Sequence, residues 1–89
     1  MARFEMADIN AAVMGQAPAG ADSFYELGLM YSTGRSVPAD LVLAHKWFNL
    51  AAMKGNPDAI RSRQEIAEGM SPSEIAAAQR AARAFLTTH

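Results

Sequence analysis

The sequence predicts an all-α fold, and three features support that prediction. Segments of helical length, rich in Ala, Leu, Met, Glu and Arg, alternate with Gly and Pro residues that mark where regular structure stops. Within these segments the apolar residues recur at spacings of three and four rather than two, and β-branched residues are few. At 89 residues, the chain has room for one domain with one small core.

The first helix is predicted over residues 21–33. Its apolar residues fall at i, i+3, i+4 and i+7, which is one face of a helix. These core candidates are Phe24, Leu27, Gly28 and Tyr31. Gly34 follows directly, and we expect it to end the helix in the left-handed conformation.

The second helix is predicted over residues 40–54, with Asp40 as its N-cap and Gly55 at its end. One stripe of this helix carries Leu41, Ala44, Phe48, Ala51 and Ala52. Trp47 precedes Phe48, and neighbouring helical residues point about 100° apart. We therefore expect this helix to pack between two neighbours.

The third helix is predicted over residues 57–68. Asn56 is its expected N-cap, Pro57 occupies the first helical position and Asp58 places an acid in the first turn. The segment runs through Ile60 and Ile66 to Gly69.

The fourth helix is predicted over residues 72–87. Ser71 and Glu74 have the spacing of a capping box, in which each side chain binds the backbone N–H of the other. One side of this helix carries Ile75, Ala78, Ala82, Phe85 and Leu86. We expect the four helices to form two stacked antiparallel hairpins with no strand.

The chain also shows an internal repeat. The starts of the first and third helices, Gly20 and Asn56, are 36 residues apart, and each precedes a helix, a short break and a second helix. Residues 19–89 therefore form the predicted domain. Residues 1–18 are predicted to hold a short helix and a linker. Either this segment or another subunit is expected to cap the first helix pair.

The first unit has a recognisable pattern. It runs Tyr25-x-Leu27-Gly28-x-Met30-Tyr31-x-x-Gly34-Arg35-x-Val37-Pro38-x-Asp40, then Ala44-x-Lys46-Trp47-Phe48-x-x-Ala51-Ala52 and Gly55-Asn56. This pattern resembles the Sel1-like repeat, a relative of the tetratricopeptide repeat, and covers one complete repeat over residues 19–55. The resemblance implies a short α-solenoid of two helix-turn-helix units and a role in protein–protein interaction, and it names no partner.

Two departures from the family pattern are visible. In the second unit, residues 56–87, Gln64 and Ala67 stand where the first unit has Gly28 and Tyr31, so this unit is degenerate and ends in a terminal helix. Ser36 occupies a loop position that the family usually fills with Gly. A positive φ there would be costlier for Ser than for Gly.

Composition and charge exclude several function classes. A net charge of -1 without a basic block argues against nucleic-acid binding. The absence of cysteine excludes disulfides, thiolate zinc sites and a thiol nucleophile. The longest strongly apolar run, residues 41–44, is far shorter than the roughly 20 residues of a membrane helix. The first ten residues lack the features of a secretory signal, so we expect a cytoplasmic protein.

No catalytic, cofactor or metal site is predicted. The Gly15 and Gly20 spacing resembles that of a phosphate loop, but Ala21 and Asp22 follow where Lys and Ser or Thr are needed. His45 has Asn49 at i+4 and no carboxylate one turn away, so we interpret it as an exposed or rim histidine. No Ser-His-acid set or carboxylate pair stands out, and we expect neither an enzyme nor a need for cofactors.

The predicted function is a binding module that presents a helical groove to a peptide or protein. In helix pairs of this type the first helix lines the concave side, so a free stripe of the first helix and its counterpart in the third become the candidate surface. These candidate partner-binding residues are Asp22, Tyr25, Leu29, Ser32, Asp58, Arg61, Glu65 and Glu68. Exposed apolar anchors bordered by charges are typical of interfaces. The alternative is a structural module in which this surface or the N-terminal edge joins two copies as a homodimer.

Overall fold

A computed structural model describes residues 20–88 and contains four helices in that range. Helix α2 spans Ala21–Thr33, α3 spans Leu41–Met53, α4 spans Pro57–Ala67 and α5 spans Pro72–Thr88. No strand occurs between residues 20 and 88. The all-α prediction is confirmed, and each predicted helix end lies within one residue of the observed one. The predicted N-terminal helix and linker in residues 1–18 lie outside the described residues.

The helix starts follow the predicted capping chemistry. Asp40 Oδ1 accepts from Leu43 N at 3.1 Å, and Asn56 Oδ1 accepts from Ala59 N at 3.1 Å. The capping box of α5 is reciprocal: Glu74 N donates to Ser71 Oγ at 3.1 Å, and Ser71 N donates to Glu74 Oε1 at 2.8 Å. Each cap satisfies a backbone N–H that the helix itself leaves unpaired, so these starts are set locally.

The turn after α2 uses two residues with positive φ. Gly34, at φ 76°, ends the helix as predicted, and Gly34 N and Arg35 N both donate to Met30 O. Ser36 adopts φ 71°, which confirms that a serine occupies a conformation suited to glycine. Asp40 N donates to Tyr31 O at 2.9 Å and returns the loop to α2.

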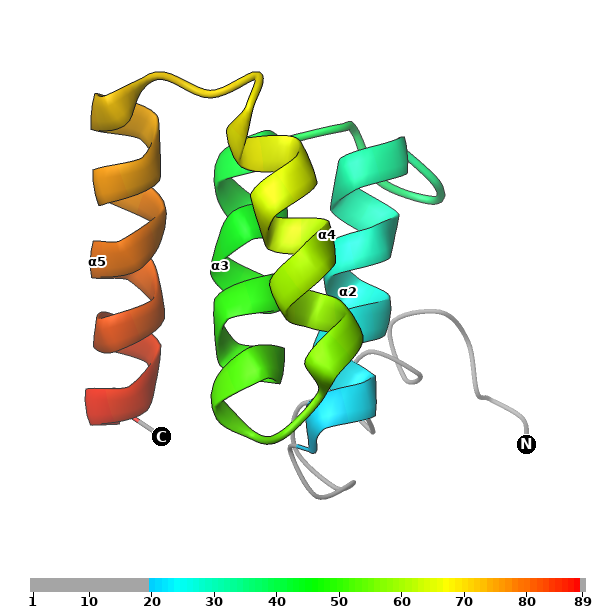
Figure 1. The fold of residues 1–89 in the computed structure, drawn as a ribbon, viewed down its shortest axis with the longest axis vertical. Helices are drawn as coiled ribbons and strands as arrows, with labels where there is room; N and C mark the ends of the chain where they lie inside the picture. The colour runs from blue at the N-terminus through cyan, green and yellow to red at the C-terminus, as the bar shows by residue number, and fades with distance from the viewer. Residues whose placement is uncertain (1–19, 89) are drawn as a thin grey trace.

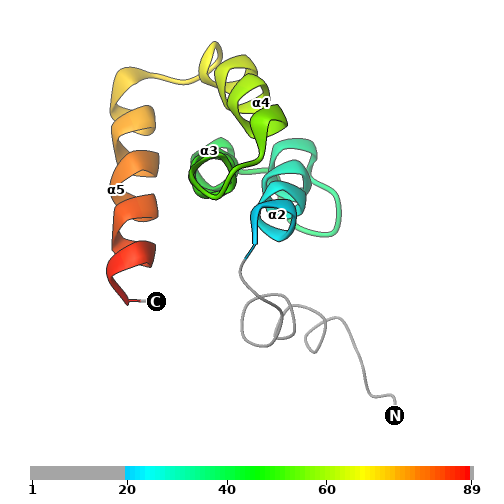
Figure 2. The same ribbon diagram turned by 60° about the horizontal axis from the view of Figure 1, so that its bottom comes forward.

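Helix α3 is the centre of the molecule. It packs against α2, α4 and α5, with α2 and α4 on one side and α5 on the other (Figures 1 and 2). The prediction that this helix lies between neighbours is therefore confirmed. Helices α2 and α3 form the predicted hairpin, whereas α4 and α5 each pack mainly on α3, so the second pair is more open than the first.

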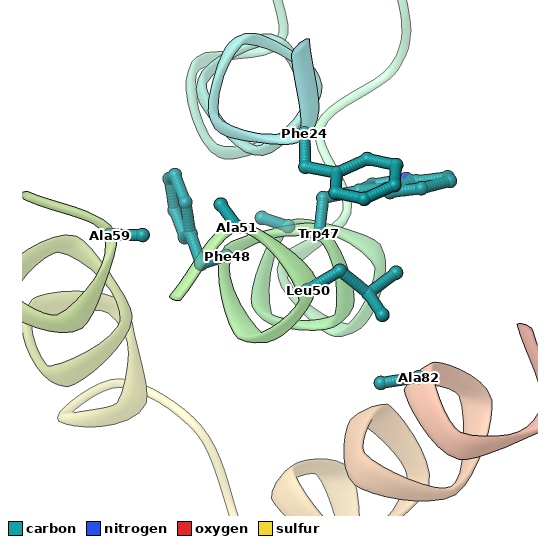
Figure 3. Packing of buried hydrophobic residues seen from close by; sticks show 8 residues of the cluster. Phe24, Trp47, Phe48, Leu50, Ala51, Ala59 and Ala82 are labelled. Carbon is teal, nitrogen blue, oxygen red and sulfur yellow. The ribbon is translucent and has the colours of Figure 1, made fainter. Parts of the chain in front are cut away.

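The core consists of side chains from α3 together with one each from α2, α4 and α5 (Figure 3). Its buried members are Phe24, Ala44, Trp47, Phe48, Leu50, Ala51, Ala59 and Ala82. Trp47 stacks on Phe24 of α2, with ring centroids 5.5 Å apart, and meets the edge of Phe85 of α5 at 5.3 Å. Phe48 lies 5.6 Å from Tyr25 on the side nearer α4. Both rings therefore pack on α2, and Trp47 also contacts α5.

Gly28 marks the closest approach of α2 and α3. A Cβ atom built at Gly28 would overlap the Phe48 ring at Cδ1 and Cε1. Because Phe48 is only 1% exposed, its ring has little space into which to move. The fold thus requires glycine here for packing, as the sequence predicts.

Candidate functional site

The strongest candidate for a functional surface is the line along which α2 and α4 meet. Tyr25 Oη lies 3.3 Å from Ser62 Oγ, so a hydrogen bond joins the two helices. Near the start of both helices, Asn56 Nδ2 donates to Asp22 Oδ1 at 3.2 Å. Residues three or four positions from Tyr25 or Ser62 lie on the same face of their helix and therefore line this contact. The α2–α4 seam, as we name it, comprises Asp22, Tyr25, Leu29 and Ser32 from α2 and Asp58, Ser62 and Glu65 from α4.

The prediction that Tyr25 and Leu29 are exposed anchors is wrong. Both are half-buried and pack against the core, Tyr25 through the Phe48 ring. Helix α4 lies close enough to α2 to cover part of their stripe, which spacing within one helix does not reveal. The fully exposed positions of α2 are Asp22, Glu26 and Thr33.

The predicted residues of α4 are exposed as expected. These are Asp58, Arg61, Glu65 and Glu68. Asp58 and Glu65 lie one turn before and after Ser62, on the seam as defined, and Arg61 lies one turn from each of them, with its Nη1 4.0 Å from Asp58 Oδ1. Six of the eight predicted residues therefore lie on the seam, together with Ser62, which no pattern in the sequence singled out.

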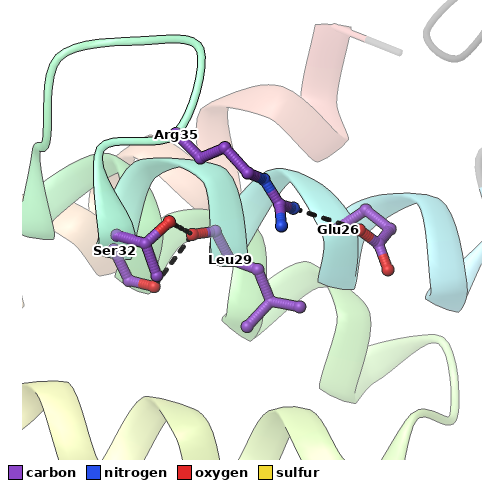
Figure 4. Close-up of polar contacts among 5 residues, drawn as sticks. Glu26, Leu29, Ser32 and Arg35 are labelled. Atoms are coloured by element: carbon purple, nitrogen blue, oxygen red, sulfur yellow. Dashed lines mark hydrogen bonds and ion pairs between the residues drawn. The ribbon is translucent and has the colours of Figure 1, made fainter.

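Two polar side chains, near the C-terminal end of α2 and in the loop that follows it, contact groups that are close to them in the sequence (Figure 4). Ser32 Oγ donates to Leu29 O at 3.1 Å within its own helix. Arg35 Nη2 lies 3.6 Å from Glu26 Oε1, so this loop cation is opposed by an acid outside the seam. The Arg35 guanidinium therefore pairs with an acid outside the seam.

A second polar group lies inside the protein, between α3 and α4. His45 is only 3% exposed, so its interpretation as an exposed or rim histidine is wrong. Asn49 Nδ2 lies 3.2 Å from His45 Nδ1, and Arg63 Nη1 donates to Asn49 Oδ1 at 2.6 Å. Because the Asn49 oxygen accepts from Arg63, its amide donates to His45 Nδ1, and the imidazole proton belongs on Nε2.

This arrangement keeps His45 neutral. Burial, and then the positive charge of Arg63, lower the pKa of His45. The chain of contacts from Arg63 through Asn49 to His45 satisfies polar groups between two helices. Its role is structural, because each member contacts another member rather than an open surface.

Lys46 closes the opposite side of α3. Its Nζ lies 4.4 Å from the centroid of the Trp47 ring and 5.5 Å from that of Phe85. Burial lowers the pKa of Lys46. Trp47 is 7% exposed, so the Trp47-Phe48 pair belongs to the core, as the sequence predicts.

Two kinds of feature are absent from residues 20–88. In that part of the chain, no three His, Asp or Glu side chains lie together in a way that could hold a metal ion. Over the same range, no helix has the length and apolar character needed to cross a membrane.

Residues 21–56, from the start of α2 to the N-cap of α4, match the family model described as Sel1 repeat. The chain contains a Sel1 repeat. The matched range agrees with the unit expected over residues 19–55. Sel1 repeats are helical repeat modules that generally mediate protein–protein interaction.

The chain is also similar to part of a longer protein. Over 66 residues, the chain is 38% identical to the alginate biosynthesis protein AlgK of Azotobacter vinelandii. The match covers 74% of this chain and 14% of AlgK, so the chain spans about one seventh of that relative. No solved structure matches the chain.

Proposed function

We propose that this protein is an interaction module that presents the α2–α4 seam to a peptide or protein partner. The observation that carries the proposal is the pair of hydrogen bonds, Tyr25 to Ser62 and Asn56 to Asp22, that join two helices of different repeat units. A surface held in place before binding loses less entropy when a partner docks. The general role of Sel1 repeats in protein–protein interaction supports the same class of function.

The composition of the seam suits a binding surface. Half-buried Tyr25 and Leu29 provide ordered apolar area, and the carboxylates of Asp22, Asp58 and Glu65 border it. Interfaces commonly combine an aromatic anchor with a polar rim. Arg61 and Glu68 extend this rim outward along α4. In this proposal the module needs neither catalysis nor a cofactor. It acts in the cytoplasm, and cell fractionation tests that location.

Site-specific photo-crosslinking tests which face binds. A photoreactive amino acid replaces Ser32 on the seam in one variant and Gln79 on α5 in a matched variant, both at the helix surface. We expect the Ser32 variant to form a discrete adduct with another polypeptide in cells and the Gln79 variant to form little of it. Equal adducts from both positions would show that the seam is not the binding face.

Self-association is the competing function. Exposed aliphatic side chains occur at Met53, Ile60 and Leu86, which are 61%, 42% and 40% exposed. Apolar surface of this kind also occurs where two copies meet. Sedimentation at two protein concentrations separates the proposals, because a homodimer shifts with concentration and a monomeric binding module does not.

A further inference from the structure

We infer that the docking of α4 on α3 is controlled by a proton, and that His45 is the group that takes it up. The control lies in the row of contacts from Arg63 through Asn49 to His45, which crosses between the two helices. Because α4 also forms half of the α2–α4 seam, the seam is assembled while His45 is neutral and comes apart when His45 is charged. The inference concerns how the helices are held together, so it goes beyond the proposed function and does not depend on it.

The direction of the hydrogen bonds in this row is fixed at one end. An arginine side chain carries only donors and does not lose its charge in a protein. Arg63 Nη1 donates to Asn49 Oδ1 at 2.6 Å, so the amide nitrogen of Asn49 is turned toward His45. That nitrogen lies 3.2 Å from His45 Nδ1, which therefore has to accept. The row is complete only while Nδ1 carries no proton.

A proton on His45 Nδ1 breaks the row whichever way the Asn49 amide points. In the present orientation, the N–H donors of His45 and Asn49 would face each other. If the amide rotates so that its oxygen accepts from His45, its nitrogen faces Arg63, which is also a donor. His45 is only 3% exposed, so the donor that loses its acceptor does not gain water in exchange. The proton also adds a second positive charge near that of Arg63.

Arg63 is the member of the row that can leave. His45 and Asn49 are four residues apart on α3, so one helix holds both in place. Arg63 belongs to α4, which contributes little to the core. Ala59 is the one buried residue of α4, and Ile66 is partly buried against the core. The loss of the Arg63 contact therefore removes a substantial part of what holds α4 on α3.

The other three helices are joined without α4. Phe24 of α2, Trp47 of α3 and Phe85 of α5 contact one another, with ring centroids between 5.3 and 5.7 Å apart. Elements with few buried contacts open locally while the rest of a protein stays folded. We therefore expect α4 to open by itself, which would also break the two hydrogen bonds that join it to α2.

Arg63 is the charged group whose field acts on His45. The other charged residues of α2 and α4 are exposed, namely Asp22, Glu26, Asp58, Arg61, Glu65 and Glu68. Tyr25 of α2, which also titrates, has its hydroxyl engaged in the seam. Lys46, the neighbour of His45 on α3, lies over the Trp47 ring. Helix α5 packs on the other side of α3, and its charged residues are exposed (Figure 2).

The direction of the pH dependence follows from the change in the surroundings of His45. Burial, and then the charge of Arg63, lower the pKa of His45 while α4 is docked. When α4 opens, the imidazole meets water and its pKa returns toward the ordinary value of about 6.5. The open arrangement therefore binds the proton more readily, and opening becomes more favourable as the pH falls below about 6.5.

Amide hydrogen exchange of the full chain, followed by NMR at pH 7.5 and 5.5, tests the inference. After correction for intrinsic exchange rates, each amide gives the equilibrium constant of the opening that exposes it. We expect the amides of α4 to open more readily than those of α3 at both pH values. The equilibrium constant for opening of α4 should rise by at least about threefold at pH 5.5.

Matched variants identify the row as the cause. Asn49→Asp places a carboxylate, which carries only acceptors, between Arg63 and His45, so it can bind Arg63 and a protonated His45 together. We expect the rise in α4 opening at pH 5.5 to disappear or reverse in this variant. Gln64→Glu makes the same change from amide to carboxylate at an exposed position of α4 and should keep the rise. His45→Asn keeps an acceptor near the position of Nδ1 but takes up no proton, so its α4 should open equally at both pH values.

Three results would overturn the inference. The first is equal protection of the amides of α4 and α3, which would show that α4 does not open by itself. The second is an opening of α4 in the parent protein that is the same at pH 7.5 and 5.5. The third is a rise that persists in Asn49→Asp or His45→Asn, with circular dichroism showing that the variant is folded; if one of the two does not fold, the other decides. Adducts from the Ser32 crosslinking variant are measured at neutral pH, so they test the proposed function separately.

Discussion

At the residue scale, packing requires glycine at position 28, although glycine is a poor helix former. Glycine within a helix costs about 0.5–1 kcal/mol relative to alanine, yet a side chain here would overlap the buried Phe48 ring. We expect Gly28→Leu to lower stability by about 1–3 kcal/mol, as overpacking does. Thermal melts followed by circular dichroism measure it, with Ala84→Leu on the exposed side of α5 as control. A Gly28→Leu variant that melts at or above the parent temperature would refute the close crossing.

Ser36 is the reverse case, a serine in a glycine conformation. With φ at 71°, its backbone lies in the left-handed region, which costs about 1–2 kcal/mol for residues with a Cβ atom. Ser36→Gly should therefore raise stability by about 0.5–1 kcal/mol, after the larger unfolded-state entropy of glycine is included. Chemical denaturation provides the value. The control Ser23→Gly, inside α2, should lower stability, and a loss at both positions would contradict the assigned strain.

His45 makes stability depend on pH. Burial and Arg63 lower its pKa in the folded protein, whereas the unfolded chain titrates near the ordinary value of about 6.5. The unfolded state therefore binds the proton more readily, and stability is full above pH of about 6.5 and falls as the pH drops below it. Urea unfolding at pH 7.5 and 5.5 measures the loss.

The control for this pH dependence is the other histidine. The variant His89→Gln should keep the pH dependence, and His45→Gln should reduce it. If both variants retain the full dependence, another group is responsible. Arg63→Met should reduce the loss of stability at low pH, because removing the positive charge lets the pKa of His45 in the folded protein rise toward its ordinary value.

At the element scale, Asn56 has two roles that substitutions can separate. It caps α4 through Ala59 N, and it donates to Asp22 of α2. Asn56→Ala removes both contacts and should cost about 1 kcal/mol or more. Asn56→Asp keeps a good cap but places a carboxylate next to Asp22. The stability that this variant loses therefore measures the contribution of the contact between α2 and α4. Urea unfolding compares the two.

The exchange of the two side chains is the control for that link. The double variant Asp22→Asn and Asn56→Asp restores one amide and one carboxylate in exchanged places, and we expect it to recover most of the loss of Asn56→Asp. No recovery would show that the contact between Asp22 and Asn56 contributes little. The α2–α4 seam would then lack one of its two supports.

At the scale of the whole molecule, Trp47 connects three helices. Its ring contacts Phe24 of α2 and Phe85 of α5, and Lys46 covers it. Trp47→Ala should cost about 3–5 kcal/mol, a large part of the roughly 5–15 kcal/mol that a small domain has. Calorimetry of Trp47→Ala beside Trp47→Phe, which keeps a ring, measures it. A loss below about 1 kcal/mol for Trp47→Ala would show that α5 does not depend on this residue.

The sequence by itself determined the helices and most of the core. Caps such as Asp40, Asn56 and Ser71 act within a few residues of the backbone groups that they bind, so their effect is visible in the order of residues. The periodicity of α2 identified Phe24 and Gly28 as buried, and the neighbouring rings of α3, Trp47 and Phe48, are buried as well. The repeat pattern carried the family assignment for the same reason, since its residues lie within one continuous segment.

Only the tertiary structure decided how the helices face one another. Tyr25 is half-buried because Ser62 and Phe48, 37 and 23 positions away, lie beside it, and His45 is buried because Arg63 reaches back to Asn49. The docking of α5 on α3 rather than against α4 likewise follows from Phe85 meeting Trp47 and Phe24. Helical periodicity defines the faces of each helix, but the rotation and distance between helices depend on how distant side chains fit together, which local spacing does not contain.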